Sequence, residues 1–287
     1  MSPAAAATNR GRTITAVRRV VRTVFTLLTV LLMSGSAAWA QTDAPPGVPP
    51  AMAMASRLAA ERVGAVQGGI YSAGEDNNFT LEPYASGKYL LRFSGHPETF
   101  VLNVERASLG AKLLKYDTGT TALRISVWGG LTLYTQNAPQ GIPATYQDAA
   151  PASQPLAISA LELQTAINDE GSHLSYVQNV PLKFSADPAV LAADPEIRGR
   201  AFDALTNAAV GIERFLAATP SSRPILAKRV NSVKVAEGGK PTVSLVGQTL
   251  LVSFVPGEGH EGHASSLAIQ QELSKLMAVS ARDIAVK

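Results

Sequence analysis

Asp117-Thr118-Gly119 is the first stretch whose residue types suggest chemistry. Aspartic proteases place this tripeptide around a catalytic carboxylate, and they need two carboxylates that share one proton. The tripeptide occurs once and Asp-Ser-Gly is absent, so this chemistry would require a symmetric dimer. Lys115 and Tyr116 precede the Asp, where a buried catalytic loop would carry apolar residues. A homodimeric aspartic peptidase using Asp117 is therefore the alternative hypothesis, and the preferred interpretation assigns no catalytic residue.

The preferred interpretation makes the same tripeptide a hairpin turn between the runs "KLLKY" and "TALRISV". An Asp side chain can accept hydrogen bonds from backbone N–H groups in a turn, and Gly119 can adopt the positive φ that many turns require. We expect Asp117 to contact the backbone of its own turn.

His260 and His263 are the second place where chemistry is conceivable. They lie three residues apart in the glycine-rich stretch "PGEGHEGH", which also holds Glu258 and Glu261. Imidazole and carboxylate groups bind zinc, but the metalloprotease motif requires histidines four apart on a helix. The pair is therefore only a weak metal candidate, and we assign neither a metal site nor a cofactor. Thiol catalysis is excluded because the chain contains no cysteine.

Three aromatic residues, Tyr116, Trp128 and Tyr134, fall on or beside neighbouring predicted strands. Aromatic side chains on one face of a sheet can bind glycans or peptides. We predict a ligand-binding patch from these three residues, with core or cross-strand packing as the alternative.

The first forty residues are typical of a secretory signal peptide. Five arginines precede the ten-residue run Val24–Met33, which is followed by Ala38-Trp39-Ala40. The order of charge, short apolar segment and A-x-A site predicts cleavage after Ala40, and the run is short of the ~20 residues that span a bilayer. We expect a periplasmic or secreted protein with no stable membrane span after cleavage.

Removal of this segment also changes the net charge. The full chain has 25 Lys+Arg against 22 Asp+Glu, and loss of the five arginines leaves 20 against 22, a net of −2. A nucleic-acid partner is excluded, because binding phosphates requires a surplus of positive charge on one face.

The remaining chain has an α+β pattern in which strands and helices are grouped. Phe100, Leu102 and Val104 alternate with polar residues, as in a strand with one buried face. We divide the chain into a signal peptide (1–40), a Pro-rich linker (41–50), a helix plus an antiparallel β meander of five or six strands (51–136), a Pro/Ala-rich connection (137–155), and a helical and β part (156–287).

The C-terminal part combines amphipathic helices with three short strands. Asp194-Pro195 has the features of a helix start, and a stripe of apolar residues follows at helical spacing. Its members are Ala201, Leu205, Ala208, Ile212 and Phe215. The runs "NSVKVAE", "PTVSLV" and "TLLVSFV", joined by "GGK" and "GQ", predict a small antiparallel sheet, and a terminal helix is expected from about Ser265.

Several of these segments together resemble an uncharacterised family of exported bacterial proteins, domain of unknown function 4908. The similarity rests on "ETFVLNVE", "YDTGTTALRISVWGGLTLYT", "AFDALTNAAVGIERFLA", "VNSVKVAEGGKPTVSL" and "HASSLAIQQEL". The motifs are the Asp-x-Gly turn, the pair Leu123-Arg124, and Gly129, Gly130 and Thr132. The resemblance implies that Asp117 lies in a shared turn of a β-rich half, and it supplies no catalytic residue.

These observations favour an exported, non-enzymatic binding or cell-envelope-associated module. Its expected partner is an envelope protein or a glycan, contacted by the β-rich half.

Overall fold

The computed structural model describes residues 66–285. They belong to one compact unit, Pro49–Lys287. The predicted signal peptide, the linker and the helix at the start of 51–136 lie outside the described residues, so these predictions are untested.

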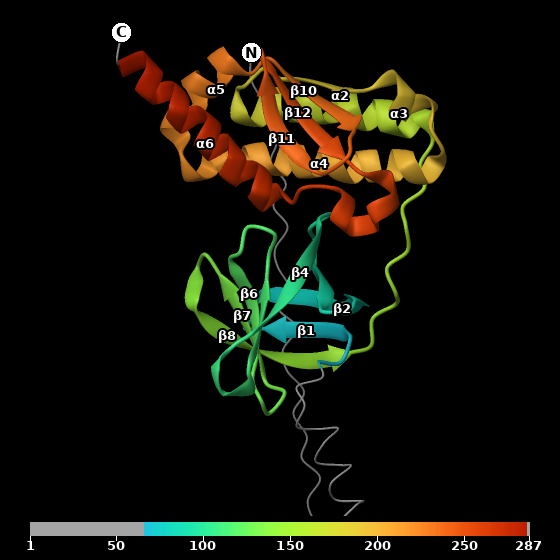
Figure 1. Cartoon of the computed structure of the whole chain (residues 1–287), viewed down its shortest axis with the longest axis vertical. Helices are drawn as coiled ribbons and strands as arrows, with labels where there is room; N and C mark the ends of the chain where they lie inside the picture. Colours follow the sequence, from blue (N-terminus) through green and yellow to red (C-terminus); the bar gives the residue numbers. More distant parts are fainter. Residues whose placement is uncertain (1–65, 286–287) are drawn as a thin grey trace, which may run out of the picture. The chain divides into compact units, whose positions relative to one another are not determined.

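The first half of the described chain is a closed barrel of eight antiparallel strands in chain order, in which β8 pairs with β1 (Figure 1). The strands are β1 (Gly69–Ala73), β2 (Asn77–Ala85), β3 (Lys88–Phe93), β4 (Thr99–Arg106), β5 (Lys112–Lys115), β6 (Thr121–Ile125), β7 (Leu131–Thr135) and β8 (Ala138–Asp148). The inward positions alternate along each strand and fill the barrel with apolar side chains. Fully buried examples are Phe79, Leu81, Leu91, Leu102, Leu114, Leu123 and Leu133.

The predicted antiparallel meander is confirmed, but it has eight strands instead of five or six. The segment 137–155, expected as a connection, instead contains the eleven-residue strand β8. Pro139 and Pro143 argued against a strand in the sequence, because proline cannot donate a ladder hydrogen bond. Both prolines lie in the part of β8 that pairs only with β7, because pairing with β1 begins at Ala144. Their missing N–H groups therefore remove no hydrogen bond between β8 and β1, the pair that closes the barrel.

Helices and a four-stranded sheet make up the second half, which we call the α/β layer (Figure 1). Its elements are α2 (Ala160–Gln178), β9 (Lys183–Ala186), α3 (Pro188–Ala192), α4 (Pro195–Ala218), α5 (Arg223–Arg229), β10 (Ser232–Glu237), β11 (Thr242–Val246), β12 (Thr249–Phe254) and α6 (Ser266–Ala285). None of the described helices combines the length and apolar character needed to cross a bilayer.

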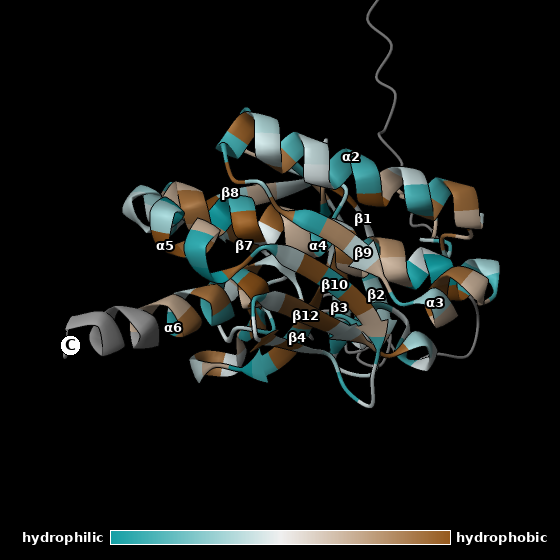
Figure 2. Cartoon of the chain, turned by 90° about the horizontal axis from the view of Figure 1, so that it is seen from above, coloured by the Kyte–Doolittle hydropathy of each residue, from teal (hydrophilic) through white to brown (hydrophobic). Residues whose placement is uncertain are grey.

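The strand order in this sheet is β11-β12-β10-β9, and it corrects the predicted antiparallel arrangement. Only β11 and β12 are antiparallel, while β10 runs parallel to both β12 and β9. The "GQ" stretch makes the expected hairpin, but "GGK" joins strands that are not neighbours. Four of the six residues of β12 are buried and none of β11 is, so β12 lies inside the sheet and β11 at its edge. Figure 2 shows the apolar colouring along β10 and β12.

Helix α4 is the centre of the α/β layer and contacts α2, α6, β10 and β12. The predicted apolar stripe is confirmed, since all five of its members are buried. Gly211 lets α6 approach closely, because a Cβ atom there would lie 2.7 Å from Cβ of Ile269. This crossing fixes the start of α6, which carries part of the candidate site.

Candidate functional site

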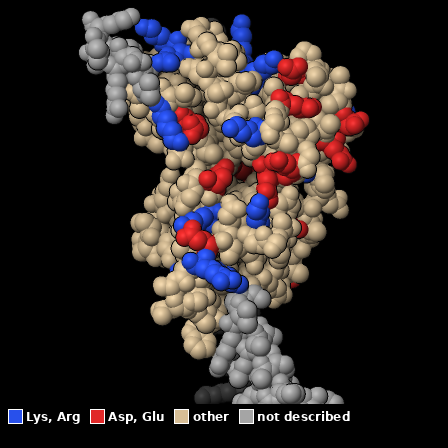
Figure 3. All heavy atoms as spheres, in the orientation of Figure 1, with Lys and Arg blue, Asp and Glu red and all other residues tan. Residues whose placement is uncertain are grey.

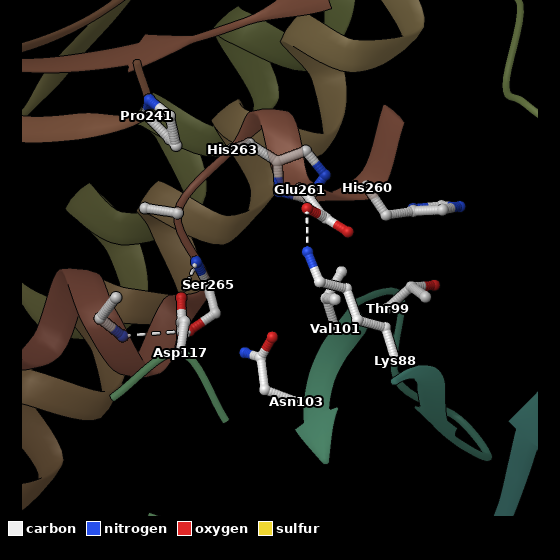
Figure 4. Close-up of a pocket in the computed structure, with 12 residues that line it drawn as sticks. Lys88, Thr99, Val101, Asn103, Asp117, Pro241, His260, Glu261, His263 and Ser265 are labelled. Carbon is white, nitrogen blue, oxygen red and sulfur yellow. Dashed lines mark hydrogen bonds and ion pairs between the residues drawn. The ribbon is translucent and has the colours of Figure 1, made fainter. Parts of the chain in front are cut away.

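A cavity of about 340 Å³ lies between the barrel and the loop that precedes α6. Thr99, Val101 and Asn103 form one wall, because their side chains alternate on β4 with the buried Phe100 and Leu102. The opposite wall is the turn η3 (Pro256–Gly262) together with residues 263–265, including His260, Glu261, His263 and Ser265. Figure 4 shows these groups around the cavity, and Figure 3 shows acidic side chains, with Lys and Arg among them, near the middle of the face drawn.

An ion pair connects the two walls of the cavity. Lys88 Nζ lies 2.5 Å from Glu261 Oε2, and both side chains are about one-third exposed, at 31% and 33% (Figure 4). Such a pair contributes little stability because water screens it, roughly 0–1 kcal/mol. Its main effect on the cavity is that the two opposite charges neutralise each other.

Asp117 lies in the predicted turn but contacts a distant part of the chain. Tyr116 N–H donates to the Thr120 carbonyl, and Gly119 has φ of 81°, as expected for the hairpin. The carboxylate, however, accepts from Ser265: Oδ1 from the hydroxyl at 2.7 Å and Oδ2 from the backbone N–H at 3.0 Å. The expected contact with its own turn is therefore replaced by a contact with the residue that caps α6.

Glu98 makes the equivalent contact one residue further along. Its oxygens accept from the backbone N–H of Ser266 at 2.7 Å and from the Ser266 hydroxyl at 2.5 Å. Burial raises the pKa of Glu98, the bonds from Ser266 and the charge of Arg214 oppose that rise, and the charge of Asp117 adds to it. Two barrel carboxylates thus meet the N-terminus of α6, where N–H groups lack intrahelical partners and the helix dipole favours negative charge.

Tyr116, Trp128 and Tyr134 do not form the predicted patch. Tyr116 points into the barrel, since it continues the inward alternation of Leu114, and its ring packs edge-on against Phe100 at 5.0 Å. Burial raises the pKa of Tyr116 to about 12. Trp128 is 76% exposed but lies in the turn at the other end of β6.

Tyr134 is half-buried on β7, and its ring covers Gly141 on β8. The alternative of core and cross-strand packing therefore describes Tyr116 and Tyr134.

The two histidines named as weak metal candidates lie together with Asp203 of α4. One ligand atom from each of the three residues lies within 4.8 Å of the other two. His263 Nε2 is 3.9 Å from Asp203 Oδ2, and the backbone N–H of His260 donates to the Tyr84 hydroxyl at 3.3 Å. A small void of about 20 Å³ adjoins all three side chains, enough for one water or one ion.

Burial sets the ionisation of this cluster. It lowers the pKa of His263 to about 4, assisted by His260 and Arg200, and it lowers the pKa of His260. It raises the pKa of Asp203 to about 6, against the opposing charge of Arg200. Both imidazoles are therefore neutral near pH 7, while Asp203 is largely ionised.

Comparison with protein families identifies a domain of unknown function. The model for Domain of unknown function (DUF4908) matches residues 51–273. The chain belongs to the DUF4908 family. No curated protein and no solved structure matches it.

The DUF4908 region contains the lining of both the cavity and the small void, including two residues that sequence analysis missed: Lys88 at the cavity and Asp203 at the void. Nothing near Lys88 in the sequence signals a distant partner. Asp203 did have a signal, because Asp203 and Asn207 are four apart on a helix otherwise rich in Ala and Leu. Two polar residues on one face of such a helix indicate a polar contact.

Proposed function

We propose that this DUF4908 protein is an exported, non-enzymatic binding module that holds a neutral glycan segment of the cell envelope in its cavity. The observation that carries the proposal is the cavity itself. Its volume of about 340 Å³ lies within the range of small-ligand sites, ~300–1,000 Å³.

The groups around the cavity favour a neutral, hydroxyl-rich ligand. Lys88 and Glu261 neutralise each other, and the carboxylate of Asp117 is bonded to Ser265. The Thr99 hydroxyl and the Asn103 amide remain to give and accept hydrogen bonds along β4, with Val101 between them. A sugar ring offers hydroxyls for the polar groups and C–H faces for the valine.

Export is the second part of the proposal, and its support is sequence alone. The five arginines, the apolar run Val24–Met33 and the Ala38-Trp39-Ala40 site support periplasmic or secreted localisation. Expression of the full chain in a bacterium, followed by fractionation and N-terminal sequencing, tests this point. A mature chain starting at Gln41 in the periplasm or medium agrees with it, and an intact N-terminus in the cytoplasm contradicts it.

The peptidase alternative gains no support from the geometry. An aspartic protease needs two carboxylates that share a proton. Asp117 and Glu98 lie near each other, but each bonds its own serine, and no hydrogen bond joins them in the described part of the chain. Both carboxylates therefore bind the start of a helix.

Binding of envelope glycan fragments to the purified mature protein, measured by isothermal titration calorimetry, tests the main proposal. Asn103→Trp places a large ring at the cavity wall, and Asn78→Trp is the matched control because Asn78 is an exposed asparagine on β2, outside the cavity. We expect at least tenfold weaker binding for Asn103→Trp and no change for Asn78→Trp. No binding by the unaltered protein, or equal binding by both variants, would overturn the proposal.

A further inference from the structure

The cluster of Asp203, His260 and His263 lies around the small void beside the cavity, and the glycan contacts proposed on β4 do not include it. The three side chains come from α4 and from the turn η3 with the residue that follows it, and their ligand atoms lie within 4.8 Å of one another. Nitrogen and carboxylate donors in this number are the usual protein ligands of a catalytic or exchangeable zinc ion.

The second observation is an unpartnered nitrogen. His263 is nearly completely buried, with 4% of its side chain exposed, and its Nε2 has no hydrogen-bond partner within residues 66–285. Buried polar atoms without partners are rare in proteins, and the binding of an ion is one explanation for such an atom. This nitrogen faces Asp203, the third member of the cluster.

The other nitrogen of His263 has the surroundings of a metal-ligating histidine. Nδ1 lies 3.2 Å from the amide nitrogen of Asn207, which itself donates to the Ala264 carbonyl at 3.0 Å. The Asn207 amide N–H is a donor, so Nδ1 accepts from it while Nε2 carries the ring proton. The Ala264 carbonyl also hydrogen-bonds the His263 ring, and it can accept the proton from Nδ1 in place of the Asn207 contact when Nε2 presents its lone pair to a metal. Histidines that bind metals commonly donate their second N–H to a backbone carbonyl or a carboxylate.

We propose that Asp203, His260 and His263 bind one divalent transition-metal ion, with zinc as the best match, and that its fourth position opens toward the cavity. Two imidazoles and one carboxylate suit zinc, copper, nickel or cobalt, whereas magnesium and calcium prefer oxygen ligands alone. The opening follows from the lining, because His260 and His263 border both the small void and the main cavity.

Modest movement brings the three groups to coordination distance. Ligands at ~2.0–2.2 Å from a tetrahedral ion lie roughly 3.4 Å apart. The present separations, which are within 4.8 Å, must therefore shorten by up to about 1.4 Å. His260 is only half-buried and can rotate toward His263, whose ring lies 6.5 Å away between centroids. Arg200 Nη1 lies 3.5 Å from Asp203 Oδ2, and the second carboxylate oxygen allows Asp203 to contact both Arg200 and an ion.

Titration of metal-free mature protein with Zn²⁺ against a chromophoric chelator tests the site. We expect one ion per chain, at least tenfold weaker binding for His260→Ala and for Asp203→Asn, and no change for His173→Ala. His173 is a suitable control because it is an exposed histidine on α2 outside the cluster. Co²⁺ in place of Zn²⁺ should give the strong visible absorption of a four-coordinate ion, and His260→Ala should remove it.

Absence of stoichiometric binding, or equal affinity for the unaltered chain and His260→Ala, would overturn the proposal. Circular dichroism spectra of each variant separate loss of the site from loss of the fold. His260→Ala is the decisive variant, since a half-buried side chain can be truncated with less damage than the buried His263. The titration uses zinc alone, so its outcome is independent of glycan binding.

Discussion

Removal of the Asp117 carboxylate should destabilise the protein by weakening the contact between the barrel and α6. The carboxylate accepts two hydrogen bonds from Ser265, at 2.7 and 3.0 Å. A hydrogen bond to a charged group contributes about 1.5–3 kcal/mol to stability. Because Asp117 is exposed, water replaces part of the interaction, and we expect a loss of about 1–2 kcal/mol for Asp117→Ala. Asp117→Asn keeps one acceptor oxygen and should lose about half as much.

Urea denaturation followed by circular dichroism measures this loss. Each kcal/mol corresponds to ~2–4 °C in the melting temperature for a domain of this size. Asp76→Asn, an exposed aspartate in the turn between β1 and β2, is the control and should change nothing measurable. A double-mutant cycle of Asp117→Ala with Ser265→Ala isolates the bond from the Ser265 hydroxyl, because the backbone N–H of residue 265 remains, and we expect a coupling energy of about 1 kcal/mol.

A coupling energy near zero would refute the stabilising bond between the Asp117 carboxylate and the Ser265 hydroxyl, because the two side chains would then contribute independently. Unchanged stability in Asp117→Asn together with loss of a peptide-cleaving activity would instead favour the peptidase alternative. The same set of variants therefore decides between the structural and the catalytic role of this carboxylate.

Three further predictions concern the barrel, the helix crossing and the ion pair. Burial raises the pKa of Tyr116 to about 12 in the folded protein, so the protonated ring contributes fully to the free energy of unfolding below pH 10. This contribution is lost as the pH rises to 12. Tyr116→Phe should therefore remove about 3 kcal/mol of pH-dependent stability over that window in denaturant titrations compared with the unaltered protein. Gly211→Ala should cost about 1–3 kcal/mol, seen as a lower urea midpoint, because its Cβ would lie 2.7 Å from Ile269. Lys88→Met should change stability by less than about 1 kcal/mol, and the change should shrink in high salt, because the pair with Glu261 is partly exposed.

The sequence predicts best those elements whose periodicity and turn chemistry agree. Strand β4 alternates cleanly, α4 carries a five-membered apolar stripe, and Gly119 adopts the positive φ expected of the turn. Each of these features depends on residues that are close in the chain.

The errors arose where a distant part of the chain decides the outcome. Pro139 and Pro143 argue locally against a strand, and only the pairing of β8 with β7 and β1 shows where proline is harmless. The insertion of β12 between β10 and β11 is likewise a property of the whole sheet.

The candidate site follows the same rule. His260 and His263 were visible as a pair, but Asp203 joins them across 57 residues through the packing of α4 against η3. Asp117 was correctly placed in a turn, yet its partner Ser265 is 148 residues away. Local spacing alone cannot indicate partners at such separations.

The cavity exists only while the barrel and the α/β layer are in contact, since Lys88 and Asn103 come from the first and His260 and Ser265 from the second. A ligand of this cavity must therefore bind the assembled form and have no affinity for a form in which the two walls are separated. A ligand at a concentration a hundred times its dissociation constant would then add about 2.7 kcal/mol to the stability of the assembled state. A bound ligand would thus act as a reversible cross-link between two segments of the polypeptide that are more than 150 residues apart.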